Sequence, residues 1–510
     1  MLGRRQFLAG TGMMVAGMLT RGMVAESIVP GASPAIAIDL GKNGGRLPHY
    51  WEWAGSDRLV VGLREQWRQD MIRARRETGM QAIRCHGLFN DEMGIATDGI
   101  GRLNFLYLDQ IYDFMLDHGV RPFVELTFMP EAFASSNNRI FFYKGNTSPP
   151  RNWADWHAMV KAYAEHCVQR YGAAEVRQWK FEVWNEPNLG FWAGTQEEYF
   201  ELYRQSALAL KSVDKDLIVG GPATAQLGWV PDFLRYCSSK NVPVDFVSTH
   251  IYPDDPQEPV FGRNRMYSFE DVMPRGLALA KQQIESSAFP QLPLWITEWS
   301  SQNPAFICEM VKRCHGLAEA ISYWTFSNVF EELGVPKGIF NNTYGMIDQW
   351  GIPRPSLHAF ALLHRLGEER LQASEGPVLA TRRADGSPAI LVWNLLPASD
   401  AAAVANGNPL GSSSGSSSAA GAARTIVLRL SGLAGRKQVR VSRVGGAVGS
   451  AVPAWKSMGS PQYPSREQLA KLRAAAELPT PESHPLTGAE PEELVIMLPA
   501  DGVALLEFER

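Results

Sequence analysis

Short apolar runs alternate with amphipathic stretches about eight times between residues 50 and 367 of this 510-residue chain. The runs have the length of buried strands, and the stretches have the apolar period of helices. The expected strands cover residues 82–86, 123–128, 180–184, 217–221, 246–250, 294–298 and 321–326, with a further short strand near 49–53. The expected helices cover residues 60–78, 105–118, 152–170, 196–212, 229–240, 269–287, 304–316 and 354–366. Eight strand–helix units close a (β/α)8 barrel, so we predict a TIM barrel over residues 50–367.

An open, doubly wound sheet is the alternative fold for such an alternation. In that fold a glycine-rich GxGxxG turn follows the first strand, and the ligand groups gather at one switch point. No such turn follows the first expected strand of this chain, and the polar strand-end residues are spread over many strands. We therefore favour the closed barrel.

The chain is too long for a single compact core, and its character changes after about residue 370. Strands separated by turn residues are expected in residues 388–396, 424–430, 437–444 and 494–507. One helix, residues 465–477, interrupts them; Ser465 caps it, and Gln468 completes a capping box. Residues 33–40 alternate like a strand of the same unit, and the serine-rich residues 411–423 read as a loop. We predict a β-sandwich accessory domain made of residues 27–49 and 368–510.

The first 26 residues are expected to lie outside the fold. Arg4 and Arg5 precede an apolar stretch at residues 7–19, and Met23-Val24-Ala25 offers a cleavage site. This resembles a twin-arginine-type signal peptide, so we expect the twin-arginine export machinery as a partner and a periplasmic or secreted location. The apolar stretch is short and contains glycine, and we expect no stable membrane span in the chain.

Charge and cysteine content exclude other classes of partner and site. The formal net charge is −4, which provides no basic surface for nucleic acid. The five cysteines form no CxxC pair and no Cys/His spacing typical of zinc. We read them as buried thiols, and we expect no metal.

Polar side chains collect at the ends of five expected barrel strands. They are Arg84 and His86 on the second strand, Asn185 and Glu186 on the fourth, His250 and Tyr252 on the sixth, Glu298 on the seventh and Trp324 on the eighth. Because the carboxyl ends of barrel strands meet on one face, these groups are predicted to converge. A single strand histidine is more often structural, but agreement across five strands indicates a site.

Two of these residues have the chemistry that glycosidic bond hydrolysis needs. The reaction uses one carboxylic acid as proton donor and one ionised carboxylate as nucleophile, and Glu186 and Glu298 are the candidates. We expect Arg84 to keep Glu298 ionised through a charge-assisted hydrogen bond, and the resulting anion to raise the pKa of Glu186. Asn185 is placed to bind the sugar 2-hydroxyl, and Trp324 to form the floor under the sugar ring.

Several strings of the chain then carry a family resemblance. They are Arg84-Cys85-His86-Gly87-Leu88-Phe89-Asn90-Asp91-Glu92-Met93-Gly94, Trp184-Asn185-Glu186-Pro187-Asn188, Thr249-His250-Ile251-Tyr252-Pro253, Thr297-Glu298-Trp299, Tyr323-Trp324-Thr325-Phe326-Ser327-Asn328-Val329-Phe330-Glu331-Glu332, Gly351-Ile352-Pro353-Arg354-Pro355-Ser356 and Trp455-Lys456-Ser457-Met458-Gly459-Ser460-Pro461. Together they resemble glycoside hydrolase family 39, the β-xylosidase and α-L-iduronidase family of the retaining (β/α)8 clan. The resemblance implies Glu186 as acid/base and Glu298 as nucleophile, with no metal or cofactor. It also implies a sugar subsite lined by His86, Asn185, His250, Tyr252, Trp324, Glu331 and Glu332.

The same residues bear on the choice of sugar. An iduronidase must neutralise the carboxylate of its substrate, and members of that branch resemble this chain but carry a lysine at the place of Tyr252. The acidic pair Glu331 and Glu332 suits a neutral sugar instead. We therefore predict an exo-acting, retaining β-D-xylosidase that releases xylose from xylo-oligosaccharides by double displacement. The alternatives are an α-L-iduronidase-like or arabinosidase-type enzyme and a non-catalytic polysaccharide-binding barrel; the last would normally have lost one carboxylate.

Overall fold

The computed structural model describes residues 35–397, except 264 and 341–343, and residues 423–509, except 434. The predicted signal peptide, residues 1–26, and all but the last residue of the predicted loop 411–423 lie outside the described residues. Within the described ranges, no helix combines the length and the apolar character that crossing a membrane requires.

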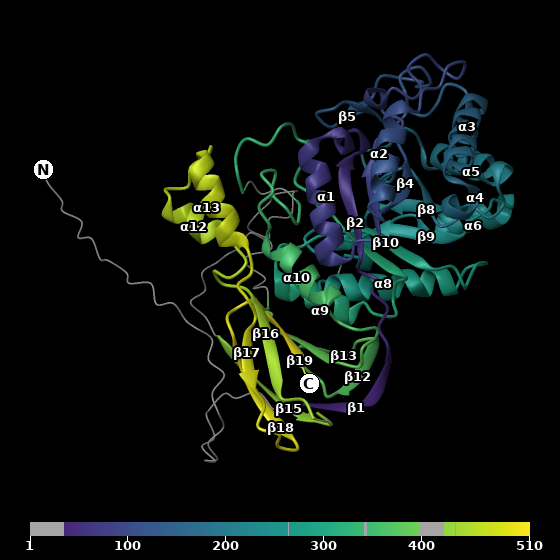
Figure 1. Cartoon of the computed structure of the whole chain (residues 1–510). Coiled ribbons are helices and arrows are strands. Elements are labelled where there is room, and N and C mark those ends of the chain that lie inside the picture. The colour runs from purple at the N-terminus through teal and green to yellow at the C-terminus, as the bar shows by residue number, and fades with distance from the viewer. Residues whose placement is uncertain (1–34, 264, 341–343, 398–422, 434, 510) are drawn as a thin grey trace, which may run out of the picture.

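Eight parallel strands close into a barrel, which confirms the predicted fold class. Around the barrel they run in the order β2 (Trp53–Arg58), β3 (Ala82–His86), β4 (Arg121–Leu126), β7 (Lys180–Val183), β8 (Ile218–Thr224), β9 (Phe246–His250), β10 (Leu294–Trp299) and β11 (Ala320–Tyr323), and β11 pairs with β2 to close the ring. Figure 1 shows the strands running through the centre of the upper domain, with the helices outside them.

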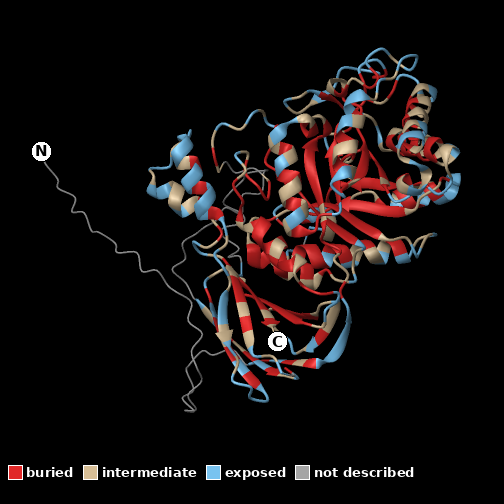
Figure 2. Ribbon diagram, in the orientation of Figure 1, coloured by how far each residue is buried: buried red, intermediate tan, exposed pale blue. Residues whose placement is uncertain are grey.

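Most helices around the barrel follow the amphipathic stretches of the sequence, and the short helices α4 and α7 lie outside the predicted ranges. They are α1 (Glu65–Thr78), α2 (Leu106–Asp117), α3 (Trp153–Tyr171), α4 (Ala173–Val176), α5 (Gln196–Val213), α6 (Val230–Lys240), α7 (Glu258–Phe261), α8 (Phe269–Glu285), α9 (Pro304–Arg313) and α10 (Pro355–His364). A short hairpin of β5 (Arg139–Ile140) and β6 (Gly145–Asn146) follows β4. Figure 2 shows buried barrel strands and helices that alternate buried and exposed residues along their length, as amphipathic helices on a core do.

The first barrel strand differs from the prediction. It was expected near residues 49–53, but β2 covers Trp53–Arg58. Its second half is Ser56-Asp57-Arg58, all buried, so an apolar pattern does not reveal it. These polar side chains have partners inside the fold: Trp67 donates a hydrogen bond of 2.9 Å to the Ser56 hydroxyl, and Arg58 pairs with three carboxylates.

The remaining strands form one curled nine-stranded sheet. Its order is β17 (Glu482–Pro485), β16 (Gln438–Val444), β19 (Val503–Glu509), β14 (Pro388–Trp393), β13 (Val378–Arg382), β12 (Glu369–Ala373), β1 (Ile36–Arg46), β15 (Arg424–Ser431) and β18 (Glu492–Leu498). Strands far apart in this order share one apolar core that includes Ile38, Leu428, Val441 and Leu506. The sheet therefore encloses its core as a β-sandwich does, and it lies beside α9 and α10 (Figure 1).

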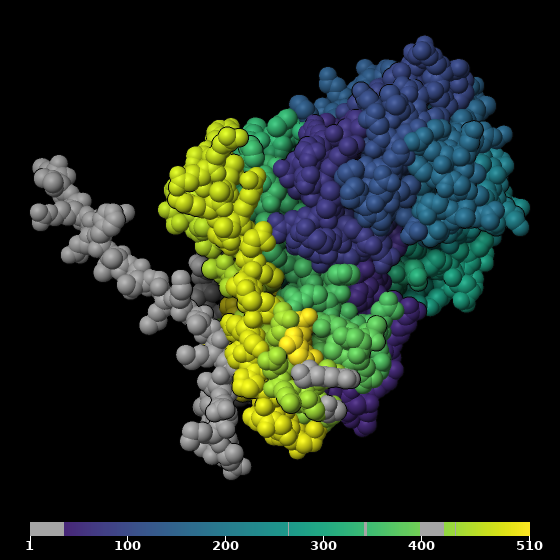
Figure 3. All heavy atoms as spheres, viewed as in Figure 1, coloured from purple at the N-terminus to yellow at the C-terminus, as the bar shows by residue number. Residues whose placement is uncertain are grey.

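A pair of helices projects from the accessory unit toward the barrel. They are α12 (Val452–Ser457) and α13 (Arg466–Ala476), and the predicted capping box of Ser465 and Gln468 is present. Their apolar side packs on the long segment 324–354 that follows β11, where the rings of Trp455 and Phe340 lie 5.5 Å apart. Arg473 donates hydrogen bonds of 2.8 and 3.0 Å to the carbonyl of Trp350 in the same segment. The space-filling view shows this helical pair next to the barrel domain (Figure 3).

Candidate active site

The guanidinium of Arg84, in the middle of β3, is the centre of the predicted constellation. It donates to Glu182 at 2.5 Å, to Glu298 at 2.7 Å and to Asn185 at 2.9 Å, and it pairs with Glu125 at 2.7 Å. Burial alone would lower the pKa of Arg84, but Glu125, Glu182 and Glu298 outweigh it and raise that pKa above its ordinary value. The predicted contact between Arg84 and Glu298 is thus present, within a larger buried network of charges.

Glu298, in β10, is held through both of its carboxylate oxygens. Oε1 accepts the hydrogen bond from Arg84, and Oε2 accepts one of 2.8 Å from the hydroxyl of Tyr252. The residue is only 5% exposed. Hydrogen bonds from a cation and a hydroxyl both stabilise the ionised form of a carboxyl group.

Glu186, directly after β7, lies in a different environment. Its Oε1 contacts Nδ1 of His250 at 2.9 Å, and its backbone adopts a φ of 41°, in the left-handed region. Burial raises the pKa of Glu186 to about 7, against the opposing influence of the His86 and Arg84 charges. Burial also lowers the pKa of His250 to about 4. At neutral pH Glu186 therefore faces an uncharged imidazole and can retain a proton.

The two carboxyl groups and the imidazole of His250 form one compact cluster. One oxygen of Glu186, one oxygen of Glu298 and one nitrogen of His250 all lie within 4.8 Å of one another. This is also the composition of a divalent-cation site, but the Arg84 guanidinium, 2.7 Å from Glu298, places a positive charge beside the cluster that opposes a metal ion. The arrangement suits two carboxyl groups acting on opposite sides of a single bond.

His86 lies between two further carboxylates. Its Nδ1 contacts Glu125 at 2.8 Å, and its Nε2 lies 3.5 Å from Glu332 and 3.9 Å from Glu298. Burial alone would lower the pKa of His86, but Glu125 and Glu332 outweigh it and raise that pKa well above its ordinary value. Burial raises the pKa of Glu332 to about 7. His86 therefore contributes a positive charge that the surrounding carboxylates neutralise.

Trp324 packs against this imidazole at the end of β11. The two ring centroids lie 4.6 Å apart, and only 2% of Trp324 is exposed. Gly55 of β2 makes the position possible, because a Cβ at residue 55 would come within 2.2 Å of the indole ring. The predicted floor residue is thus placed beside the charged network by a glycine on the neighbouring strand.

The acidic pair after Trp324 does not act as one unit. Glu332 faces His86, as described, but the carboxylate of Glu331 turns to Arg58 at 2.9 Å and Arg64 at 2.5 Å. The backbone N–H of Glu331 also donates to Asp57 at 2.8 Å. We expected both glutamates at the sugar subsite, but the structure brings only Glu332 to the cluster, because two arginines hold Glu331.

Several residues of the site were missed by the sequence reasoning. Glu125 and Glu182 lie in the middle of the apolar strands β4 and β7, and a charge in such a run was the signal available. Phe141, in the β5–β6 hairpin, stacks on His86 at 6.2 Å, and Tyr344 lies 6.2 Å from Tyr252. Neither aromatic residue belongs to a barrel strand, so strand-end counting does not find them.

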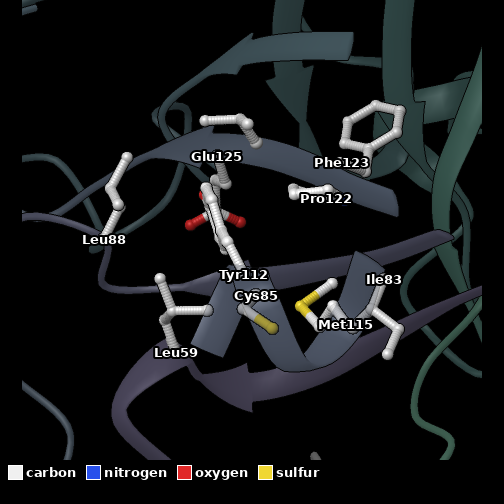
Figure 4. Close-up of a pocket in the computed structure, with 10 residues that line it drawn as sticks. Leu59, Ile83, Cys85, Leu88, Tyr112, Met115, Pro122, Phe123 and Glu125 are labelled. Atoms are coloured by element: carbon white, nitrogen blue, oxygen red, sulfur yellow. The ribbon is translucent and has the colours of Figure 1, made fainter. Parts of the chain in front are cut away.

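Cys85 is separate from the site although it precedes His86. It lines a small internal cavity of about 10 Å³ together with Met115 and Tyr112 of α2 (Figure 4). Side chains of consecutive strand residues point to opposite faces, so Cys85 lies behind the strand and His86 in front of it. All five cysteines of the chain are buried and free.

Comparison with known proteins places this geometry in a family. The sequence model of Glycosyl hydrolases family 39 matches residues 35–490. A β-xylosidase of Caldicellulosiruptor saccharolyticus is 36% identical over 470 residues, which cover 87% of this chain and 91% of that protein. A β-xylosidase of Geobacillus stearothermophilus is 35% identical, over 90% of this chain and 92% of that protein.

Solved structures agree with the sequence comparison. The crystal structure of a monomeric β-xylosidase from Caulobacter crescentus CB15 superposes with a TM-score of 0.82 and 34% identity, covering 94% of this chain and 99% of that one. The matches extend over the barrel and the accessory sheet alike. The chain therefore belongs to glycosyl hydrolases family 39 and is a glycoside hydrolase.

Proposed function

We propose that this enzyme is an exo-acting, retaining β-D-xylosidase that releases xylose from xylo-oligosaccharides by double displacement. The observation that carries the mechanism is the proximity of the two carboxyl groups: one oxygen of Glu186 lies within 4.8 Å of one oxygen of Glu298. Retaining glycosidases keep their carboxyl groups about 5–5.5 Å apart, whereas inverting enzymes need about 6.5–9.5 Å to admit a water molecule.

In the first step, the Glu298 carboxylate attacks the anomeric carbon, and Glu186 donates its proton to the glycosidic oxygen. The C–O bond to the leaving sugar breaks, and an ester bond forms between the xylosyl group and Glu298. The raised pKa of Glu186 supports its role as acid, and the hydrogen bonds from Arg84 and Tyr252 support an ionised Glu298.

In the second step, water replaces the leaving sugar. Glu186, now ionised, takes a proton from the water, whose oxygen attacks the anomeric carbon and displaces Glu298. Xylose is then released, Glu298 is again a carboxylate, and Glu186 has recovered its proton. Two inversions give net retention of configuration.

The polar surroundings support a neutral sugar. Arg84 and His86 are the cations closest to the carboxyl pair among the described site residues, and both are neutralised by glutamates. Asp254 and Asp255 follow Tyr252 in the same loop, and burial raises the pKa of both carboxyl groups, that of Asp255 to about 7. A uronate would find no free positive charge among the site residues that the structure describes, whereas sugar hydroxyls can donate to Glu332. Together with the similarity to two β-xylosidases, this favours xylose.

Azide rescue tests the assigned roles. Glu298→Ala should abolish hydrolysis of an aryl β-xyloside, and added azide should restore turnover with the α-xylosyl azide as product, through a single inversion. Glu186→Ala should give the β-azide, because azide then attacks the covalent intermediate. Glu165→Ala, an exposed substitution on α3, serves as the matched control. No azide product from either variant would exclude the double displacement.

A substrate panel tests the sugar. Aryl β-D-xyloside should be hydrolysed with the highest kcat/KM, ahead of α-L-arabinoside and β-D-glucoside, and aryl α-L-iduronide should be inert. Xylobiose should release xylose from its non-reducing end. Preferential hydrolysis of the iduronide would overturn the choice of substrate but not the mechanism.

We also propose that residues 1–26 direct export through the twin-arginine machinery. The support is the Arg4-Arg5 pair ahead of an apolar stretch in the sequence. Replacing both arginines by lysine should retain the enzyme in the cytoplasmic fraction of its host. Unchanged periplasmic activity in that variant would contradict the proposal.

A further inference from the structure

A second cluster of carboxylate and imidazole groups lies at the opposite end of the barrel strands. His49 and Glu52 precede β2, and His364 ends α10. Oε1 of Glu52 lies 2.7 Å from Nδ1 of His49 and 2.6 Å from Nδ1 of His364. One atom from each of the three side chains thus lies within 4.8 Å of the other two.

The surroundings of the cluster are rigid on one side and open on the other. His49 stacks on Trp51 with a centroid distance of 4.6 Å, and its Nε2 is buried with no hydrogen-bond partner. Glycine at residue 79 allows the backbone to pass close to His364, because a Cβ there would lie 2.2 Å from Nδ1 of His364. The side chain of His364 is 39% exposed, so the cluster remains accessible.

A large cavity leads to these side chains. Its volume is about 1140 Å³, and His49, Glu52 and His364 are among the residues that line it. Arg46 and Lys281 also line this cavity and have other partners: Arg46 pairs with Glu368 at 3.1 Å, and Lys281 donates to the carbonyl of Gly316 at 2.9 Å. Neither of these contacts involves Glu52, whose Oε2 accepts a hydrogen bond of 3.1 Å from the uncharged amide of Gln81. Glu298 in the active site differs, because its partner Arg84 is a cation.

The cluster also joins the two connections between barrel and accessory sheet. His49 and Glu52 lie on the link from β1 to β2, and His364 lies at the start of the link from α10 to β12. The same two links are hydrogen-bonded where the N–H of Leu47 donates to the carbonyl of Glu368 at 2.7 Å. A bond between His364 and Glu52 therefore fastens the two chain crossings to each other.

We propose that His49, Glu52 and His364 bind one divalent transition-metal ion, best matched by Zn²⁺, which clips the two crossings together. Two imidazole nitrogens and one carboxylate oxygen are ligands that Zn²⁺ takes at about 2.0–2.2 Å, with water from the cavity in the fourth position. Each neutral imidazole would then carry its proton on Nε2 and present the Nδ1 lone pair to the ion. Small rotations of His364 and Glu52 would widen the nitrogen–oxygen gaps enough to admit it.

The test uses the full-length protein without a histidine tag. Calorimetric titration with ZnCl₂ should show saturable binding of one ion per chain, and CoCl₂ should produce the visible absorption of a four-coordinate site. Zn²⁺ should raise Tm by a few degrees, because the ion binds the folded state. Hydrolysis of an aryl β-xyloside should be unchanged, since the cluster lies at the end of the barrel away from Glu186 and Glu298.

Variants separate a metal site from a hydrogen-bonded cluster. His364→Gln keeps an N–H donor for Glu52 but is a poor metal ligand, so it should fold with a similar Tm and lose Zn²⁺ binding and the Zn²⁺-dependent rise in Tm. His49→Ala should lose them as well, while His118→Ala, on the surface after α2, should bind as the wild type does. The proposal is overturned if the wild type binds no Zn²⁺, if His364→Gln binds it equally well, or if binding only inhibits hydrolysis.

Discussion

The two ends of the barrel hold clusters of the same residue types with opposite electrostatic outcomes. At the catalytic end, Glu186 contacts one imidazole, and burial raises the pKa of this carboxyl group to about 7. At the other end, Glu52 is also buried, but hydrogen bonds from His364 and His49 outweigh burial and lower its pKa to about 2. The hydrogen bonds that Glu52 receives from two imidazoles, and that Glu186 does not receive, account for the opposite directions of these two pKa shifts.

The difference also separates catalysis from stability. A carboxyl group with few donors costs stability when it ionises, yet it can exchange a proton near neutral pH. A carboxylate with several donors stabilises the fold and does not exchange a proton there. Arg84 supplies the contrast inside the active site, because it gives Glu298 the donor that Glu186 lacks.

Removal of Arg84 should cause the largest loss of stability and activity at the catalytic end. Arg84→Ala leaves Glu125, Glu182 and Glu298 buried without their cation, so unfolding free energy should fall by about 3–5 kcal/mol, with loss of activity. Urea unfolding followed by fluorescence measures the first effect, and aryl xyloside hydrolysis the second. The exposed Arg102→Ala is the control. A stable, active Arg84→Ala enzyme would show that the network does not set the charge of Glu298.

The pH profile should report the raised pKa of Glu186. The acid must be protonated, so kcat/KM for a substrate with a poor leaving group should fall about tenfold per pH unit above about pH 7. A dinitrophenyl xyloside needs no proton, and its glycosylation step should lack this alkaline limb. Identical alkaline limbs for the two substrates would assign the titration to another group.

Loosening the loop beside the site should have a smaller effect. Glu331→Gln weakens the contacts with Arg58 and Arg64, which should cost about 1–2 kcal/mol and shift Glu332 and Trp324. We expect KM for the xyloside to rise about tenfold with little change in kcat, because the substitution weakens sugar binding and leaves the acid Glu186 in place. Glu65→Gln, on exposed α1 surface, is the matched control. A large fall in kcat with unchanged KM would contradict this positioning role.

The smallest effect is expected at the non-catalytic end. The pKa of Glu52 lies below its unfolded value, so its stabilising contribution is present above about pH 4.3 and is lost as pH falls toward about 2. Glu52→Gln should therefore lower the unfolding free energy by about 1–2 kcal/mol at pH 7. At pH 3 the difference in unfolding free energy between the wild type and the variant should be smaller, and hydrolysis should be unchanged at both pH values. An equal difference in unfolding free energy at both pH values would mean that the charge of Glu52 is not the source of the stabilisation.

The sequence was sufficient for the barrel, the accessory sheet and the chemical type of most site residues. The strands β9 and β10 were located within about a residue, because each begins with two apolar residues and contains β-branched residues. The strand β2 was misplaced because its second half is polar, and both Asp57 and Arg58 depend on a partner more than two hundred residues away, Glu331. No local pattern contains that information.

The same limit applies to the site. The pairing of Arg84 with Glu298 follows from strand-end geometry, but the division of labour between Glu331 and Glu332 depends on where Arg58 and Arg64 lie. Adjacent residues in a loop have no fixed period, so sequence alone does not tell which of the two faces inward. The stacking of Phe141 on His86 depends on the β5–β6 hairpin, and the sequence alone does not tell which residue of that hairpin faces the site.

The helical pair α12–α13 has a consequence for engineering and for evolution. It belongs to the accessory unit by sequence, yet it packs on Ile339, Phe340 and Ile352 of the segment that follows β11. The same segment carries Trp324, Glu332 and Tyr344, which contact site residues. A barrel excised at residue 367 would keep both carboxyl groups of the reaction and lose the buttress of its sugar pocket. The two units are thus not interchangeable modules, and a graft of this barrel onto another scaffold would have to carry its own helical support.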